Sequence, residues 1–157
     1  MIGEPLFIVP LHTNSSSPHY ALCYEVYGSA GTIFNLISDR CVSVNALYSP
    51  MADPEDGNMI TSVGILSVDN TGQCIGVTIS ASGVTNITIG SSSQQLTGLY
   101  SRHGVSVSRR LQRVRVSVPN CDRVQLVMWL VSERDQQLRI TITRGLNLRP
   151  TSHGLIG

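Results

Sequence analysis

Apolar and polar residues alternate with a period of two along most of this chain, and this pattern limits its fold more than any other feature. In residues 113–118 three valines alternate with two arginines and a serine, and residues 75–81 and 138–143 alternate in the same way. Such alternation gives a β-strand one apolar and one polar face. No segment keeps the apolar spacing of an amphipathic helix over a dozen residues. The sequence therefore predicts an all-β fold with little helix.

Short polar turn signals separate the successive strand-like segments. They occupy residues 28–31, 69–72, 120–122 and 132–137. Because a parallel crossover needs a dozen or more residues, such short connections predict antiparallel hairpins. We expect an antiparallel meander of about ten strands, folded into a sandwich or a flattened barrel, with residues 1–157 forming a single domain.

Four stretches carry more particular expectations. Residues 123–132 are almost continuously apolar, which is typical of a central strand buried on both faces. Residues 13–19 and 49–58 and the serine-rich run 90–95 are polar or carry proline, and we expect them to form long loops.

The charge content and the apolar runs argue against two classes of function. Only 13% of the 157 residues are charged and the formal net charge is +1, so no field of one sign attracts nucleic acid in general. No apolar run approaches the ~18 residues that a membrane helix needs. The first residues also lack the basic region and cleavage site of a signal peptide. We expect either an intracellular protein or a piece of a longer secreted one.

The cysteines and two glycosylation sequons favour the secreted alternative. Asn14-Ser-Ser and Asn86-Ile-Thr are acceptor sequences, and the cysteine count is even. The alternative is a set of reduced core cysteines in an intracellular protein. Two bridges would each add ~2–4 kcal/mol, and the pair Cys74–Cys121, beside two hairpin turns, is the pairing that we favour. The disulfide candidates are Cys23, Cys41, Cys74 and Cys121.

Arginine is the only strongly basic residue, since the protein has eleven arginines and no lysine. Four of them, Arg109, Arg110, Arg113 and Arg115, fall within seven residues. Arg113 and Arg115 project from one strand face about 7 Å apart, a pitch that suits sulfate or carboxylate groups of a polysaccharide. The alternative is a solvated face that discourages edge aggregation. Arg109-Arg110, if it lies in an exposed turn, would also be a protease site.

The remaining polar motifs predict no catalytic site, metal or cofactor. Residues 53–58 hold three carboxylates and an asparagine, but their spacing and their proline and glycine favour a turn over a calcium site. The wide cysteine spacings argue against zinc. The sequence has no Gly-x-Ser-x-Gly nucleophile elbow, and no acidic residue has a sequence spacing from a histidine that indicates a catalytic site. The histidines are His12, His19, His103 and His153.

Five segments resemble, in order, the C-terminal region of inter-alpha-trypsin inhibitor heavy chains. They are "GEPLFIVPL", "YALCYEVYGSAGTIFNLISD", "CVSVNALY", the stretch 61–89 and the closing "LNLRPTSHGLIG". The resemblance implies a secreted, non-enzymatic, β-rich module of a protease inhibitor heavy chain, distantly similar to von Willebrand D-type domains and concerned with hyaluronan metabolism. It also makes His153 part of a structural turn.

The sequence departs from this family at its processing motif. Classical members are cleaved between Asp and Pro, and the new terminal Asp is esterified to chondroitin sulfate and passed to hyaluronan. Here Glu4 and Pro5 take those places, and glutamate attacks its own carbonyl poorly because it is one methylene longer. We therefore do not expect this cleavage and ester transfer here, and expect the module to stay attached to its precursor. The function that we expect is an extracellular module that associates with hyaluronan or a sulfated glycosaminoglycan, with upstream domains of its own protein or with other extracellular domains. The alternative is a disulfide-braced structural module of a secreted von Willebrand D-type-like polymer or coat protein.

Overall fold

The computed structural model is built from antiparallel β-strands, with no helix among the residues that it describes. These residues are 6–11, 20–25, 31–38, 40–50, 58–119, 125–133 and 137–143. The strands are β1 (Leu6–Leu11), β2 (Tyr20–Glu25), β3 (Ile33–Ser38), β4 (Val42–Pro50), β5 (Asn58–Val68), β6 (Cys74–Ser80), β7 (Thr85–Ile89), β8 (Ser92–Gln95), β9 (Leu99–Arg102), β10 (Val105–Arg110), β11 (Arg113–Pro119), β12 (Gln125–Glu133) and β13 (Gln137–Thr143).

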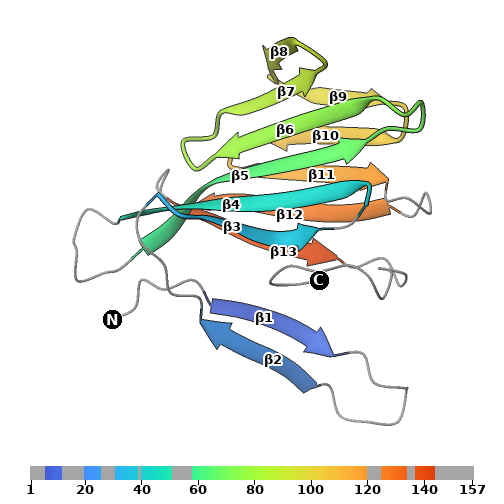
Figure 1. Ribbon diagram of the computed structural model, residues 1–157. Coiled ribbons are helices and arrows are strands. Elements are labelled where there is room, and N and C mark those ends of the chain that lie inside the picture. The colour runs from blue at the N-terminus through green and yellow to red at the C-terminus, as the bar shows by residue number, and fades with distance from the viewer. Residues whose placement is uncertain are drawn as a thin grey trace.

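Eleven of these strands form two sheets that face each other (Figure 1). Strands β3 to β8 make a six-stranded sheet and β9 to β13 a five-stranded one, while β1 and β2 pair in a two-stranded sheet of their own. Within each sheet every strand pairs with the strand next to it in sequence, always antiparallel. The predicted all-β meander is confirmed, and it takes the form of an open sandwich.

The core lies between the two larger sheets, where the alternating apolar residues meet. Val63 and Ile87 of one sheet, and Val107, Val116 and Met128 of the other, have no exposed surface. Each fully buried side chain of this kind stabilises the fold by ~1.5–3 kcal/mol. The period-two pattern of the sequence therefore identified the buried face of both sheets.

Strand β12 differs from its prediction as a strand buried on both faces. Met128 and Leu130 are buried, but Trp129 between them is 44% exposed, and Val127 and Val131 are half-buried. These three residues lie on the outer face of the five-stranded sheet, which no further layer of described residues covers. A continuous apolar run therefore does not imply two covered faces here.

The serine-rich run that was expected to be a loop forms the edge strand β8. Its backbone pairs with β7 from Asn86 opposite Gln95 to Ile89 opposite Ser92, although all four of its side chains are exposed. Pairing with a sheet edge uses backbone groups, so it does not require the apolar side chains on which a strand prediction depends. The loop expected over residues 49–58 is also shorter than predicted, because Ser49 belongs to β4 and Asn58 belongs to β5.

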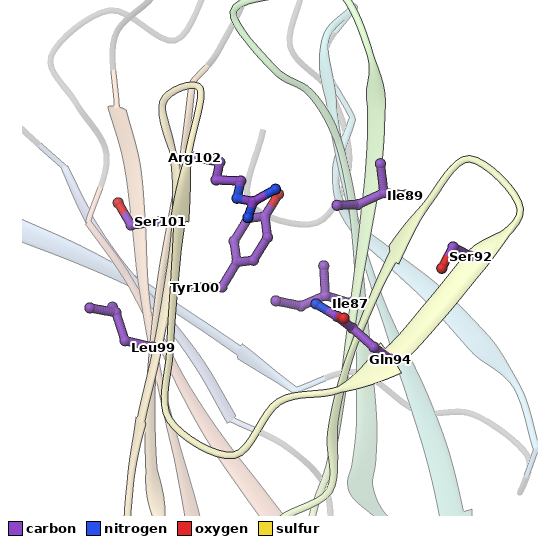
Figure 2. Close-up of a pocket in the computed structure, with 8 residues that line it drawn as sticks. All are labelled: Ile87, Ile89, Ser92, Gln94, Leu99, Tyr100, Ser101 and Arg102. Carbon is purple, nitrogen blue, oxygen red and sulfur yellow. The ribbon is translucent and has the colours of Figure 1, made fainter.

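One short connection, directly after β8, joins the two larger sheets. The amide of Leu96 donates to the carbonyl of Thr85 at 2.8 Å, and the amide of Arg109 donates to the carbonyl of Gly98 at 2.9 Å. Leu96 itself is buried. This connection ties β8 to β9, and the two strands run on from it in different sheets (Figure 2).

Candidate functional site

The strand register gathers three of the four clustered arginines on the outer face of the five-stranded sheet. Arg110 of β10 lies opposite Arg113 of β11, and Arg115 of β11 lies opposite Trp129 of β12. The residues that alternate with them, such as Val114, face the core. We call Arg110, Arg113, Arg115 and Trp129 the arginine–tryptophan face.

Arg110 and Arg113 are like charges placed directly across a hairpin. Side chains opposite each other in an antiparallel pair have Cβ atoms about 4.5–5.5 Å apart, and like charges there are destabilising. Both side chains are exposed, and neither has a hydrogen bond or ion pair with any residue that the structure describes. The pair therefore concentrates positive charge that the described part of the protein leaves uncompensated.

Arg115 is fixed by the aromatic ring beside it. Its guanidinium carbon lies 5.5 Å from the centre of the Trp129 ring, within the range of a cation–π interaction. At a partly exposed site this contact stabilises by ~0.5–1 kcal/mol. Arg139 of β13 lies opposite Val131, which in turn lies opposite Arg113, so Arg139 is in the same row of the sheet as Arg110 and Arg113.

Arg109 does not join this face, which corrects the prediction of one cluster of four. It lies opposite Val114 on the inner side of β10, and its guanidinium rests against the β6–β7 turn. A Cβ added to Gly83 would lie 2.9 Å from its Nη2, and the φ of Gly83, +89°, is the reason that this turn favours glycine. Arg109 therefore lies between the two sheets at this end and not on the outer face.

Arg109 and Arg110 do not lie in an exposed turn, so the expectation of a dibasic protease site there is wrong. Both Arg109 and Arg110 are paired residues of β10, and the turn consists of Leu111 and Gln112. Proteases bind extended segments that can leave the fold, whereas these two residues lie within the sheet. Leu111 is 87% exposed and has a φ of +54°.

The cysteines do not pair as we favoured. Cys74, at the start of β6, is a free and exposed thiol, so the pairing Cys74–Cys121 is wrong. Cys74 points away from the core, since its neighbour Ile75 is the buried residue. Cys41 is disulfide-bonded. The side chains of Cys23 and Cys121 lie outside the described residues.

Asp69 stabilises the turn that the sequence predicts at residues 69–72, although its side chain was not singled out from the sequence. In the β5–β6 turn its Oδ1 accepts hydrogen bonds from the Thr71 amide at 2.8 Å, the Thr71 hydroxyl at 2.6 Å and the Gln73 amide at 2.9 Å. These bonds, with the Thr71 hydroxyl as the largest cause, hold the pKa of Asp69 below its ordinary value, and His103 acts in the same direction. The aspartate two residues before threonine is the usual signal of such a turn.

The other predicted positions are placed only in part. Asn86 of the second sequon lies half-buried on the outer face of the six-stranded sheet, and His103 lies in the β9–β10 turn. No cluster of metal-ligating residues occurs among the described side chains. The positions outside the described residues are Glu4, Pro5, His12, Asn14, His19, His153 and the acidic run 53–57.

Comparison with known proteins adds no relative, because no known family, curated protein or solved structure matches this sequence. The resemblance to the C-terminal region of the inhibitor heavy chains therefore stays a prediction from the quoted segments. No helix in the described ranges has the length and apolar character to cross a membrane.

Proposed function

We propose that this protein is a non-enzymatic extracellular binding module, and that its arginine–tryptophan face binds an anionic polysaccharide. The observation that carries the proposal is the exposed Arg110–Arg113 pair beside the Arg115–Trp129 contact. The resemblance to the inhibitor heavy chains supports the same class of ligand, hyaluronan or a sulfated glycosaminoglycan.

The chemistry of the face suits sulfate and carboxylate groups. A guanidinium offers a planar fork of donors that binds such groups two hydrogen bonds at a time. An anion between Arg110 and Arg113 would also relieve their mutual repulsion, so binding and fold stability favour the same ligand. Arg115 lies two residues from Arg113, about 7 Å along the strand, which places a second anion site on the same face.

Trp129 distinguishes this face from a merely solvated strand. Its ring is 44% exposed, so part of its surface is open to a ligand. The ring can cover the apolar face of a sugar while the neighbouring guanidinium groups bind the charged substituents. The described outer face of this sheet carries no carboxylate, since Asp69, in the other sheet, is the only acidic side chain described.

Affinity chromatography on immobilised heparin and hyaluronan tests the proposal. We expect retention at physiological salt on at least one matrix, with elution on raising the salt because screening weakens such contacts. Arg113→Gln and Arg115→Gln should each weaken binding roughly tenfold, the loss of one charge-assisted contact. Arg102→Gln is the control, since it removes the same charge from the inner side of β9. Elution of the native protein and all three variants at one salt concentration would contradict the proposal.

A further inference from the structure

A second, separate site lies at the edge of the sandwich, between β7 and β8 of one sheet and β9 of the other. A cavity of about 450 Å³ opens there, within the size range of small-molecule sites. Figure 2 shows Tyr100 and Arg102 extending from β9 toward Ile87 and Ile89 of β7, with Gln94 of β8 beside them. The connection after β8 lies at one end of this crevice, beside Gln94 and Leu99, and Arg102 lies at the opposite end (Figure 2).

The floor of the crevice is apolar. Ile87 has no exposed surface, Tyr100 is 8% exposed, and Ile89 is half-buried against the core. These side chains belong to well-packed strands, so the floor is formed before any ligand arrives. Because Ile87 and Tyr100 are already almost covered, an apolar body in the crevice would mainly cover the remaining surface of Ile89 and of the Tyr100 ring.

Three polar groups face this floor without partners in the described part of the protein. The Arg102 guanidinium, the Tyr100 hydroxyl and the Gln94 amide make no hydrogen bond or ion pair with any described residue. All three can donate hydrogen bonds, and one of them carries a positive charge. The Arg102 guanidinium and the Tyr100 hydroxyl lie at the end of the crevice away from the connection after β8, whereas the Gln94 amide lies beside Ile87 nearer to that connection (Figure 2). A charged donor beside apolar side chains suits a ligand with an anionic group at one end.

We propose that this crevice binds a small monocarboxylate with a compact apolar body. The carboxylate accepts from the Arg102 guanidinium, in the bidentate geometry that suits this pair, and from the Tyr100 hydroxyl. The apolar body lies against Ile87, Ile89 and the Tyr100 ring. The site is independent of the arginine–tryptophan face, because Leu99 and Ser101 are the β9 residues that point to that outer face (Figure 2).

Saturation-transfer NMR with phenylacetate as the probe tests this proposal on the 157-residue protein. Phenethylamine and 2-phenylethanol are the matched probes, since they keep the ring and replace the anion by a cation or a neutral group. We expect phenylacetate to bind with a Kd of about 1 mM, as is usual for a ligand of its size. Both matched probes should bind at least about tenfold more weakly.

Two variants assign the binding to the crevice. Arg102→Gln should weaken phenylacetate binding about tenfold or more, because it removes the charged group that lines the cavity. Gln94→Glu, on the exposed strand β8, places a like charge in the crevice beside Ile87 and should also weaken binding (Figure 2). Arg113→Gln is the control and should leave phenylacetate binding unchanged, although it weakens polysaccharide binding. The Arg102→Gln variant should keep native heparin retention, so the two proposals fail separately.

Three results would overturn the inference. The first is the absence of saturation transfer from the folded protein to phenylacetate. The second is equal transfer to phenylacetate and phenethylamine, which would mean that the charge is not recognised. The third is native affinity in both Arg102→Gln and Gln94→Glu, which would place the probe elsewhere on the surface.

Discussion

Two turn residues, Leu111 and Asp69, lie in environments that are energetically unfavourable for them. Leu111 combines a left-handed backbone with an almost fully exposed apolar side chain. Asp69 is almost fully buried, and its second carboxylate oxygen, Oδ2, has no hydrogen-bond partner among the described residues. For each of these residues we predict the effect of a substitution on the unfolding free energy.

Replacement of Leu111 by glycine should not destabilise the protein. A left-handed backbone costs an L-residue roughly 1–2 kcal/mol, and glycine avoids this cost at the expense of ~0.5–1 kcal/mol of backbone entropy. We expect the unfolding free energy of Leu111→Gly to equal or exceed the native value by up to about 1 kcal/mol in urea titrations. Gln112→Gly is the matched control, because Gln112 has no positive φ, and it should lose ~0.5–1 kcal/mol. Equal losses in both variants would contradict the strain at Leu111.

The contribution of Asp69 to stability should disappear in acid. Because its pKa is lower in the folded protein than in the unfolded one, its carboxylate stabilises the fold fully above pH about 4. The contribution is lost as the pH falls through the lower folded pKa. The difference in unfolding free energy between the native protein and Asp69→Asn should therefore be constant from pH 7 to 5 and shrink below pH 4. A difference that stays constant down to pH 2.5 would refute this role.

At the scale of the single strand, alternation decides which residues matter for the fold. Val114 and Val116 of β11 are buried, whereas Arg113 between the turn and Val114 is exposed. The sequence predicts this division correctly, because a strand that is covered on one side shows its burial as a period of two. The prediction for β12 was wrong, because apolar residues occupy both of its faces and the pattern carries no information about exposure.

Adjacent substitutions in β12 should therefore have very different effects. Met128→Ala opens a cavity in the core and should cost about 2–5 kcal/mol of unfolding free energy. Trp129→Ala removes a larger side chain, but from the outer face, and should cost no more than about 1–2 kcal/mol, including its contact with Arg115. Thermal and urea unfolding measure both values. If Trp129→Ala were the more destabilising change, the assignment of the outer face would be wrong.

The sequence does not predict where each strand ends or which residues become neighbours across strands. Arg109 and Arg110 are consecutive, yet the register sends one to the interior and the other to the surface. The sequence does not show that these two side chains face opposite sides of the sheet, because this depends on the turn being at Leu111 and Gln112. In the same way, Trp129 becomes a neighbour of Arg115 only through the pairing of β11 with β12.

At the scale of the whole molecule, the two sheets have different surfaces. The described outer face of the five-stranded sheet carries arginines and the tryptophan, whereas that of the six-stranded sheet carries amide, hydroxyl and apolar groups, including the residues of the second sequon. The crevice between β7, β8 and β9 belongs to neither face. No sequence pattern indicates it, because it combines residues of two sheets that are joined by a single short connection.

The fluorescence of Trp129 tests the central claim most directly, because it is the only tryptophan of the protein. Titration with a size-defined heparin oligosaccharide should change its emission in a saturable manner, and the midpoint should rise about tenfold in Arg113→Gln and with increasing salt. The Arg102→Gln variant should titrate like the native protein. Emission that does not change at any oligosaccharide concentration, or the same midpoint in the native protein and in Arg113→Gln, would contradict polysaccharide binding at the arginine–tryptophan face.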